Sequence, residues 1–421
     1  MQKHVEWDDL WFVPAKHVKR DDQNVRTGDI LISTANSYEL VGKVAQVAGL
    51  PTPATLGAFI SLIRPKDNVH PKFLYHQLAW GKTQTRIREM SSNTTNISNV
   101  STKKLATLEL SVPNFDEQTL IVAELEKQFS RLDEAVANLQ RVKANLKRYK
   151  ASVLKDAVEG RLVPTEAELA RRDGRSFETG EQLLQRILVR RRKAWRGKRN
   201  YREPVAPEIE GLPEVPTGWT WASPDQLSAS EPYSLAIGPF GSSLKVSDYT
   251  TEGVPLVFVR NIRAVSFGGP ETVFVTPDKA EELKAHIVEA GDILVTKMGA
   301  PPGDVCMYPP TRPPAVITAD CIKLRLTREH LFATFFAYAI ESKLVQSQIQ
   351  AITKGVAQLK VSLGNFSSIG FPLPTVGEQR RIVAEVDRRF SSIRSVEAEV
   401  DVNLKRARAL RQSVLGKSFS A

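Results

Sequence analysis

Apolar residues recur at helical spacing along two long stretches of the chain. Between about residues 117 and 157 they step by three and four, as in Val122, Leu125 and Phe129, and residues 378–415 repeat the pattern. No Pro or Gly interrupts either stretch. Such spacing is typical of a helix with one apolar seam. At about 1.5 Å per residue each helix is roughly 60 Å long, so we expect the two to cover each other's seams as an antiparallel pair.

These helices are parts of a longer internal repeat. The pattern Pro-x-x-x-Glu-Gln-x-x-Ile-Val occupies residues 113–122 and returns 261 positions later at 374–383. Upstream, Gly-Asp-Ile-Leu occupies 28–31 and returns 263 positions later at 291–294. Solenoid repeats run to about 20–50 residues, far less than this period. The sequence therefore predicts two copies of one unit, each a globular part followed by a long helix.

The globular parts have mixed patterns. Apolar runs at 253–259 and 291–295, bounded by Gly and Pro, predict short buried strands. Residues 331–349 and their counterpart 73–87 carry apolar helical faces. Between the units, a basic run from Arg186 to Arg199 and four following prolines predict a helix and then an extended linker. The fold class expected is α+β.

This interpretation divides the chain into five segments. They are a first globular domain at 1–113, a first long helix at 114–158, a linker with a basic helix at 159–216, a second globular domain at 217–374 and a second long helix at 375–421.

The charge of the chain favours one class of partner. The 421 residues include 58 Lys and Arg against 47 Asp and Glu, a formal charge of +11. This excess favours a polyanion, most often nucleic acid, although other protein classes share it. Two cysteines and 6 histidines make a structural metal unexpected. The first residues do not follow a signal-peptide pattern, and no run approaches the roughly 18 apolar residues of a membrane span, so we expect a cytoplasmic protein without membrane contact.

Motifs of catalysis are not evident. The sequence has no Gly-x-Gly-x-x-Gly after a strand, and the Gly-Lys-Thr at 81–83 is not preceded by the first glycine of a phosphate loop. Pro277-Asp278 followed by Glu282-Leu283-Lys284 superficially matches a nuclease signature. The acidic residues of that signature lie on adjacent strands, whereas these fall within one helix-like stretch. His70, His76 and His286 are interpreted as surface or packing residues.

With these units in view, the chain resembles the specificity subunits of type I restriction–modification systems. The matching residues are both helix starts, both Gly-Asp-Ile-Leu segments, and Leu-Pro-Glu-Val-Pro-Thr-Gly-Trp-Thr-Trp at 212–221. The resemblance implies two target recognition domains, each reading half of a split double-stranded DNA sequence. It implies that the long helices form an antiparallel coiled coil with a pseudo-two-fold internal repeat.

Partners and chemistry also follow from the resemblance. Two methyltransferase (modification) subunits would dock on the helices, and restriction (motor-nuclease) subunits would join them. The assembled complex would methylate adenine and cleave DNA, while this chain would be non-catalytic and bind no cofactor. Two alternatives stay open: a stand-alone DNA-binding protein, and an enzyme with an unrecognised site.

The first domain departs from the family pattern. The second domain begins near Gly218, about 45 residues before the point equivalent to Met1. We therefore expect the first domain to lack the opening Gly-Trp segment and the strand after it. Either this domain is naturally short or the true start lies upstream.

Base reading needs side chains at base edges, with Lys and Arg on phosphates. Instead of contacting DNA, Ser242 and Asn261 could each close a turn, and Lys245 could be a solvated surface residue. The basic run Arg190–Lys193 is more simply a solvated helix face, with phosphate or partner contact as alternatives. The candidate DNA-binding residues, taken from predicted loops and the approach to the second helix, are Thr34, Asn36, Lys43, Asn93, Thr94, Asn96, Ser242, Ser243, Lys245, Arg260, Asn261, Arg263, Lys297, Lys354, Gln358 and Lys360.

Overall fold

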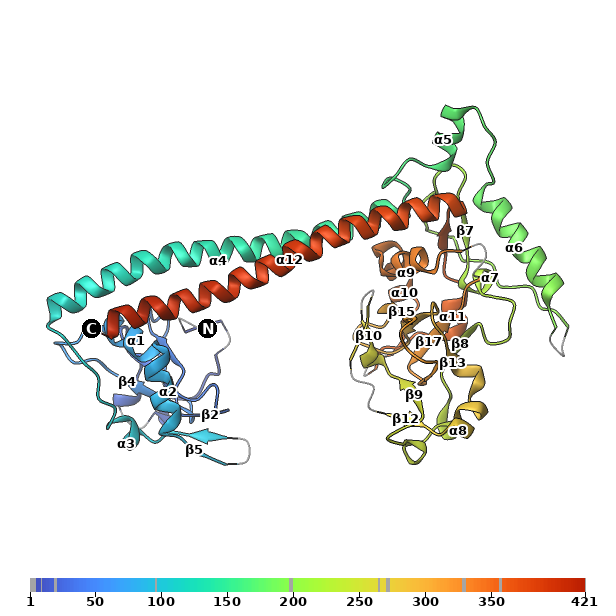
Figure 1. Cartoon of the computed structure of the whole chain (residues 1–421). Helices are drawn as coiled ribbons and strands as arrows, with labels where there is room; N and C mark the ends of the chain where they lie inside the picture. The colour runs from blue at the N-terminus through green and yellow to red at the C-terminus, as the bar shows by residue number, and fades with distance from the viewer. Residues whose placement is uncertain are drawn as a thin grey trace. The chain divides into compact units, whose positions relative to one another are not determined.

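The computed structural model describes residues 5–8, 10–18, 21–94, 97–196, 200–263, 266–269, 273–327, 331–355 and 358–420. Two compact units make up the fold (Figure 1). Unit 1 comprises Met1–Lys143 with Glu397–Ala421, and unit 2 comprises Ala144–Val396. Each unit therefore contains part of both long helices, α4 (Phe115–Val158) and α12 (Val376–Phe419).

Unit 1 is built on a three-stranded antiparallel sheet in the order β3-β1-β4. Ile30 and Ile32 of the central strand are fully buried and share one apolar core with Leu78 of α1. A second small sheet has the order β2-β6-β5. The elements are β1 Ile30–Ser33, β2 Ala35–Asn36, β3 Val44–Gln46, β4 Ile60–Ile63, α1 Pro71–Ala79, α2 Gly81–Glu89, β5 Ser92–Asn93, β6 Ser98–Asn99 and α3 Thr102–Leu105.

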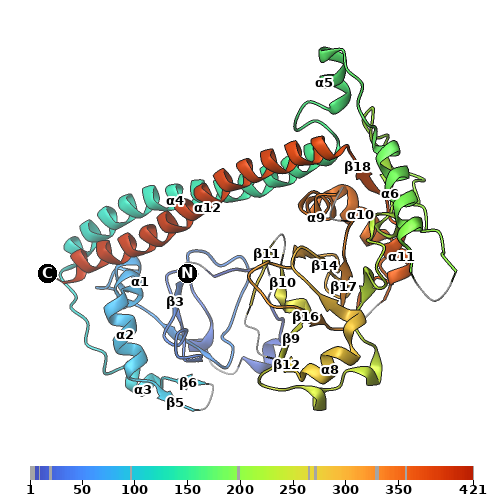
Figure 2. The same ribbon diagram turned by 45° about the vertical axis from the view of Figure 1, so that its right-hand side comes forward.

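Unit 2 contains two four-stranded sheets, β12-β9-β16-β13 and β15-β14-β17-β8. All pairings in them are antiparallel except β16 with β9. The main apolar core joins the second sheet to α9 and to the start of α12, which lie side by side in Figure 2. Two-stranded pairs β18-β7 and β10-β11 complete the sheets of the described residues.

The strands of unit 2 are β7 Thr220–Ala222, β8 Leu235–Ile237, β9 Val254–Val257, β10 Ile262–Arg263, β11 Ser266–Phe267, β12 Phe274–Val275, β13 Ile287–Val288, β14 Ile293–Thr296, β15 Val305–Met307, β16 Ala315–Ile317, β17 Cys321–Leu324 and β18 Phe371–Leu373. Its helices are α5 Glu166–Asp173, α6 Gly180–Ala194, α7 Pro224–Leu227, α8 Pro277–Glu282, α9 Ala333–Glu341, α10 Lys343–Ala351 and α11 Leu363–Ser367. The predicted strands at 253–259 and 291–295 are confirmed as β9 and β14.

Each long helix starts with the same pair of contacts. The side chains of Asn114 and Thr375 accept the backbone N–H groups of the glutamates three residues on, at 2.9 and 3.3 Å. Such caps satisfy N–H groups that the first turn leaves unpaired. Buried Gln118 and Gln379 then accept the N–H groups of His70 and Phe332, at 2.8 and 3.0 Å. The repeated Glu-Gln sequence thus fixes each helix start to its own unit.

The long helices contact each other within both units. In unit 1, Phe129 of α4 shares a buried cluster with Leu415 of α12, and the Arg411 guanidinium lies 4.1 Å from the centre of the Phe129 ring. In unit 2, Leu154 of α4 shares the main core with Phe390 of α12. The beginning of one helix therefore meets the end of the other in each unit, as antiparallel packing requires. A continuous coiled coil stays a prediction.

One predicted helical stretch is divided in each unit. Residues 73–87 form α1 and α2, separated at Trp80, and residues 331–349 form α9 and α10, separated at Ser342. Both separating residues have extended backbones, with ψ of 134° and 151°. The sequence pattern does not reveal this bend, because the two helices on either side of it turn their apolar sides to the same core.

Candidate nucleic-acid interface

An arginine–aspartate pair anchors the strand that leads to the predicted recognition loops in each unit. Two guanidinium nitrogens of Arg64 lie 2.8 Å from the carboxylate oxygens of Asp29, just before β1. Those of Arg325 lie 2.9 and 2.7 Å from Asp292, just before β14. The hydrogen bonds raise the pKa of both arginines, since they favour the charged form. Two-point pairing of this kind fixes orientation as well as distance.

A glutamine holds the far side of the same loop in each unit. Gln84 donates hydrogen bonds of 2.7 Å to the carbonyls of Gly42 and of Leu78 in α1. Gln346 donates bonds of 2.8 Å to Gly303 and to α9 in the same way. Both glycines have positive φ, 82° and 107°, a region that favours glycine. Equivalent contacts in the two units therefore fix the start of the strand before each loop and the glycine at the far side of that loop.

Lys297 follows β14 directly and is half-buried. Its ammonium donates to the carbonyl of Ala319 at 3.2 Å and lies 4.8 Å from the centre of the exposed Phe240 ring. Its carbonyl accepts the N–H of Val361 at 3.0 Å. This lysine therefore joins three separate segments of the chain.

Lys354 and Lys360 lie on the neighbouring segment and are exposed. Their backbones exchange two hydrogen bonds, of 3.0 and 2.9 Å, and Lys360 also forms a bridge with Met298. Gln358, two residues before Lys360, is exposed. Lys297, Lys354 and Lys360 are called the unit 2 lysine cluster below, because backbone pairing brings their segments together.

Ser242 and Ser243 follow Phe240 in the short 3-10 turn Gly241–Ser243, and Lys245 immediately precedes a second one, Val246–Asp248. All three side chains are exposed. The backbone N–H of Lys245 donates to the carboxylate of Asp248 at 2.7 Å. The contact of Lys297 with Phe240 places the first of these turns beside the unit 2 lysine cluster.

Arg260 and Asn261 are adjacent candidates, but they differ in exposure. Arg260 is exposed and stacks 4.0 Å from the centre of the Phe258 ring. Asn261 is buried, accepts the N–H of Phe258 at 2.9 Å and donates to Gly268 at 3.3 Å. It closes a turn, the alternative the sequence left open, so we leave it out of the proposed surface. Arg263 lies in β10, and its side chain is outside the described residues.

Unit 1 assembles its candidates on the sheet β2-β6-β5. Asn36 pairs with Ser98, and Ser98 pairs in turn with Asn93. Asn36, Asn93 and Thr94 are exposed, and Thr94 donates to the carbonyl of Ile97 at 3.0 Å. The pairing of Asn36 with Ser98 is equivalent to that of Met298 with Lys360, because both residues of the second pair lie 262 positions after those of the first.

The remaining described candidates of unit 1 are less exposed. Thr34 is half-buried and donates its hydroxyl to Phe59 at 3.1 Å. Lys43 is half-buried beside Gly42. Asn96 lies outside the described residues.

Two residues that shape these surfaces were missed from the sequence. Ser98 is buried and pairs with both Asn36 and Asn93 in the sheet β2-β6-β5, and Phe240 is the exposed ring beside Lys297. The repeat offset applied to Lys360 would have found Ser98. Phe240 has no such signal, because its segment precedes every matched part of the repeat.

The residues that the structure describes do not form a metal site or a nuclease-like pair on adjacent strands. No group of three or more His, Cys, Asp or Glu there could hold a metal ion. Asp278 and Glu282 both lie on α8, so they sit on one helix as the sequence indicated. His76 is buried 3.1 Å from Glu126, and burial lowers its pKa. In the described part of the chain, no helix is long and apolar enough to cross a membrane.

Comparison with known proteins identifies relatives of this chain. The family model of the type I restriction modification DNA specificity domain matches residues 16–147 and 256–399. The type I restriction enzyme StySPI specificity subunit of Salmonella potsdam and the EcoKI specificity subunit of Escherichia coli K12 are each 23% identical over 416 residues. Those matches cover 98% of this chain and 78% of each relative.

A solved structure has the same fold. It comes from work on complex assembly and conformational transition of the type I R-M system, and has a TM-score of 0.61 at 17% identity. The match covers 94% of this chain and 82% of that one. The family model falls on both copies of the repeat, one in each unit. The chain therefore belongs to the family of type I restriction–modification DNA specificity proteins.

Proposed function

We propose that this chain is the DNA-reading subunit of a type I restriction–modification complex and that it recognises a two-part target in double-stranded DNA. One observation carries the proposal. The two units hold equivalent loops with equivalent contacts, yet present different side chains there. A duplicated scaffold with two different reading surfaces suits a target with two different halves.

The chemistry of the surfaces suggests a division of work. Unit 1 presents amides and hydroxyls at Asn36, Asn93 and Thr94, groups that can pair with base edges in the major groove. Unit 2 presents the lysine cluster, with Gln358 close by in the chain and Ser242 and Ser243 in the turn after Phe240, whose ring Lys297 contacts. Lysine ammonium groups suit phosphates, which provide affinity and register, while the neutral side chains can discriminate bases.

Two methyltransferase subunits would dock on the outer faces of α4 and α12, and restriction subunits would join through them. The chain itself would be non-catalytic and would bind no cofactor, because the methyl donor belongs to the methyltransferase partners. We place the protein in the cytoplasm, where bacterial DNA is accessible.

Modified-base sequencing of DNA from cells that co-express this chain with its methyltransferase partner tests the proposal. We expect methylated adenines in a motif with two defined halves separated by a fixed gap. One defined half would restrict reading to a single unit. Methylation or cleavage by the purified chain alone would contradict the adaptor function. Tight specific binding by that chain without partners would favour the stand-alone alternative.

A further inference from the structure

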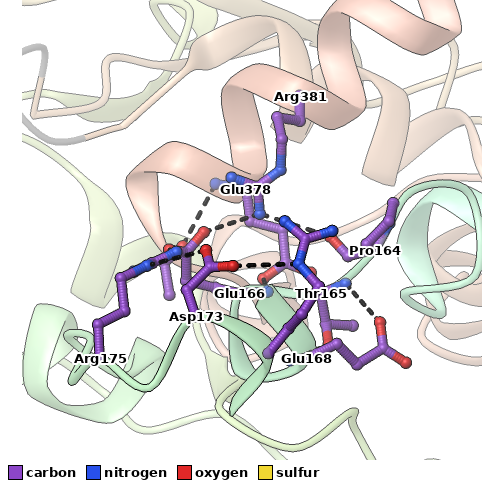
Figure 3. A network of polar contacts seen from close by, with 10 residues as sticks. Pro164, Thr165, Glu166, Glu168, Asp173, Arg175, Glu378 and Arg381 are labelled. Atoms are coloured by element: carbon purple, nitrogen blue, oxygen red, sulfur yellow. Dashed lines mark hydrogen bonds and ion pairs between the residues drawn. The ribbon is translucent and has the colours of Figure 1, made fainter. Parts of the chain in front are cut away.

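The polar network at the start of α12 is explained by contacts within the fold. Arg381 and Arg175 donate to the two carboxylate oxygens of Glu166 (Figure 3). The carboxylate of Glu378 accepts the backbone N–H of Glu166 at 3.2 Å. These contacts hold α5 against α12. The exposed ring of Phe240, at the candidate DNA surface, needs a different explanation.

Phe240 presents a large apolar side chain to solvent. It is 62% exposed, and among the described residues it belongs to none of the apolar cores of unit 2. A single exposed apolar residue is common on protein surfaces and by itself indicates nothing. Two further observations distinguish this one: the backbone before it is fixed, and a cation lies over one face of its ring.

The backbone that carries Phe240 is held tightly against the sheet. Gly238 and Pro239, the two residues before it, are buried. The N–H of Gly238 donates to the carbonyl of Cys321 at 3.2 Å, in continuation of the pairing of β8 with β17. A Cβ atom at Gly238 would lie 2.1 Å from the carbonyl oxygen of Thr318, so this close approach requires glycine. The ring of Phe240 is therefore presented from a fixed base.

Lys297 occupies one face of the Phe240 ring. Its ammonium lies over the ring, 4.8 Å from the centre, and also donates to the carbonyl of Ala319 at 3.2 Å. A cation in this position is attracted by the electrons of the ring face. A ring that inserts between two base pairs needs both of its faces free. The arrangement therefore leaves one face and the edge of Phe240 available for contact, and it disfavours intercalation.

We propose that the open face of Phe240 packs against the C5 methyl group of a thymine in the major groove, and that this contact selects a T·A pair in the half of the target read by unit 2. The inference rests on the proposed function and names one of its reading contacts. The thymine methyl is the apolar group that base edges present in the major groove, and phenylalanine is one of the side chains that contact it. Ser242 and Ser243 follow Phe240 and are exposed, so they can bond to the polar edges of neighbouring bases.

The surroundings of the ring favour this contact over two others. Phosphate oxygens are repelled by the electron-rich face of an aromatic ring, and the unit 2 lysine cluster is present to bind them. An apolar surface of a protein partner would cover the ring, but it would also cover neighbouring ammonium groups without offering them acceptors, which is costly. The major groove offers an apolar methyl group, polar base edges and anionic phosphates together.

Replacement of thymine by uracil removes only the C5 methyl group and tests the inference. The thymines on both strands of the methylated motif are replaced one at a time, and fluorescence anisotropy measures binding by the complex of this chain with its methyltransferase partners. We expect one replacement to weaken wild-type binding by about three- to fivefold, the effect of one buried methyl group. In Phe240→Ala the same replacement should have no effect, because the partner of the methyl group is already absent. Phe240→Leu, which keeps an apolar side chain, should retain part of the effect.

Tyr233→Ala is the matched control, since Tyr233 is also 62% exposed but precedes β8, whereas Phe240 follows it. It should leave the effect of every uracil replacement unchanged. Wild-type binding that no uracil replacement weakens, or uracil effects of equal size in wild type and Phe240→Ala at every thymine, would overturn the inference. Failure of Phe240→Ala to assemble with the methyltransferase would assign the ring to a protein contact and would also overturn it. A wild-type complex that yields no two-part motif would instead contradict the proposed function, which the methylation test decides before any uracil duplex is made.

Discussion

The three lysines of the unit 2 lysine cluster differ in how tightly the fold holds them. Lys297 is tied to Ala319 and Phe240, whereas Lys354 and Lys360 are exposed and held through their backbones alone. The two exposed side chains can therefore be removed without loss of a described side-chain contact. They are the cleaner probes of phosphate contact.

We expect Lys354→Ala and Lys360→Ala each to weaken DNA binding of the assembled complex to a similar degree on cognate and unrelated sequences. Each should lower the slope of log affinity against log salt by about 1, as loss of one phosphate contact does. Lys284→Ala, at an exposed position outside both long helices and the unit 2 lysine cluster, is the control. Filter binding over a range of salt concentrations measures the slope, and an unchanged slope in both variants would remove these lysines from the interface.

Glu341 is a half-buried acid at the end of α9. Burial raises its pKa from 4.5 to about 7, against the opposing effect of Lys150. Its Oε2 forms no hydrogen bond with a described residue. A carboxyl whose pKa is higher in the folded state stabilises the fold at low pH and loses that contribution as pH rises from about 4.5 to 7.

Glu341→Gln should therefore gain stability over the wild type as pH increases across this window. The gain should reach a plateau on the order of 3 kcal/mol above pH 7, from about 1.4 kcal/mol per pKa unit. Chemical denaturation of unit 2 at pH values from 4 to 8.5 measures it. Curves for the two proteins that stay parallel across the range would show that Glu341 ionises freely in the folded state.

At the residue scale, the repeat located equivalent positions but not their roles. The Gly-Asp-Ile-Leu segments were matched from the sequence, whereas the pairing of Asp29 with Arg64 and of Asp292 with Arg325 was not predicted. Asn261 was placed among DNA contacts because polar residues in loops favour recognition, but a short turn buries it. Burial inside a turn depends on neighbours such as Gly268, which no local pattern identifies.

Among the elements, the buried glutamines at the helix starts are the most informative. Gln379 accepts the N–H of Phe332 and donates to the carbonyl of Pro374, each at 3.0 Å. It therefore ties the last strand, the first turn of α12 and the entry of α9 together.

Gln379→Ala should reduce the stability of unit 2 by about 2 kcal/mol, because it leaves a buried donor and a buried acceptor unpaired. Hydrogen exchange at the amide of Phe332 should rise accordingly. Gln128→Ala, on the exposed side of α4, should have little effect. Protection of Phe332 that survives Gln379→Ala would mean that other groups hold the entry of α9.

Elements with strong periodicity were predictable, and those set by tertiary contacts were not. The predicted ranges of α4 and α12 agree with the structure to within a few residues, because their apolar steps are long and regular. The bends at Trp80 and Ser342 were missed, since both sides of each bend carry apolar residues toward one core. A short strand such as β2 pairs only through a long-range contact, with β6.

At the scale of the whole molecule, the proposed function makes α4 and α12 the spacer between two reading surfaces. Adding seven residues to both helices, after Lys143 and after Val396, lengthens each by roughly 10 Å. At about 3.4 Å per base pair, the gap in the methylated motif should grow by roughly 3 base pairs. Modified-base sequencing of cells expressing this variant measures the gap.

An insertion in α4 alone serves as the control. The α4–α12 contacts of unit 1 and those of unit 2 then require different registers of α4 against α12, so one set must break and methylation should be lost rather than moved. An unchanged gap after the double insertion would mean that the helices do not set the spacing.

The division of both long helices between the units also has a consequence for synthesis on the ribosome. The core of unit 1 includes Leu415 and contacts with Phe419, whereas unit 2 is complete in sequence at Val396. Unit 1 therefore cannot close until residues 397–421 are made, and unit 2 can close before it. A nascent chain that stops shortly before Leu415 would carry a finished middle and an open apolar seam at Leu125 and Phe129, a substrate for chaperones and proteases.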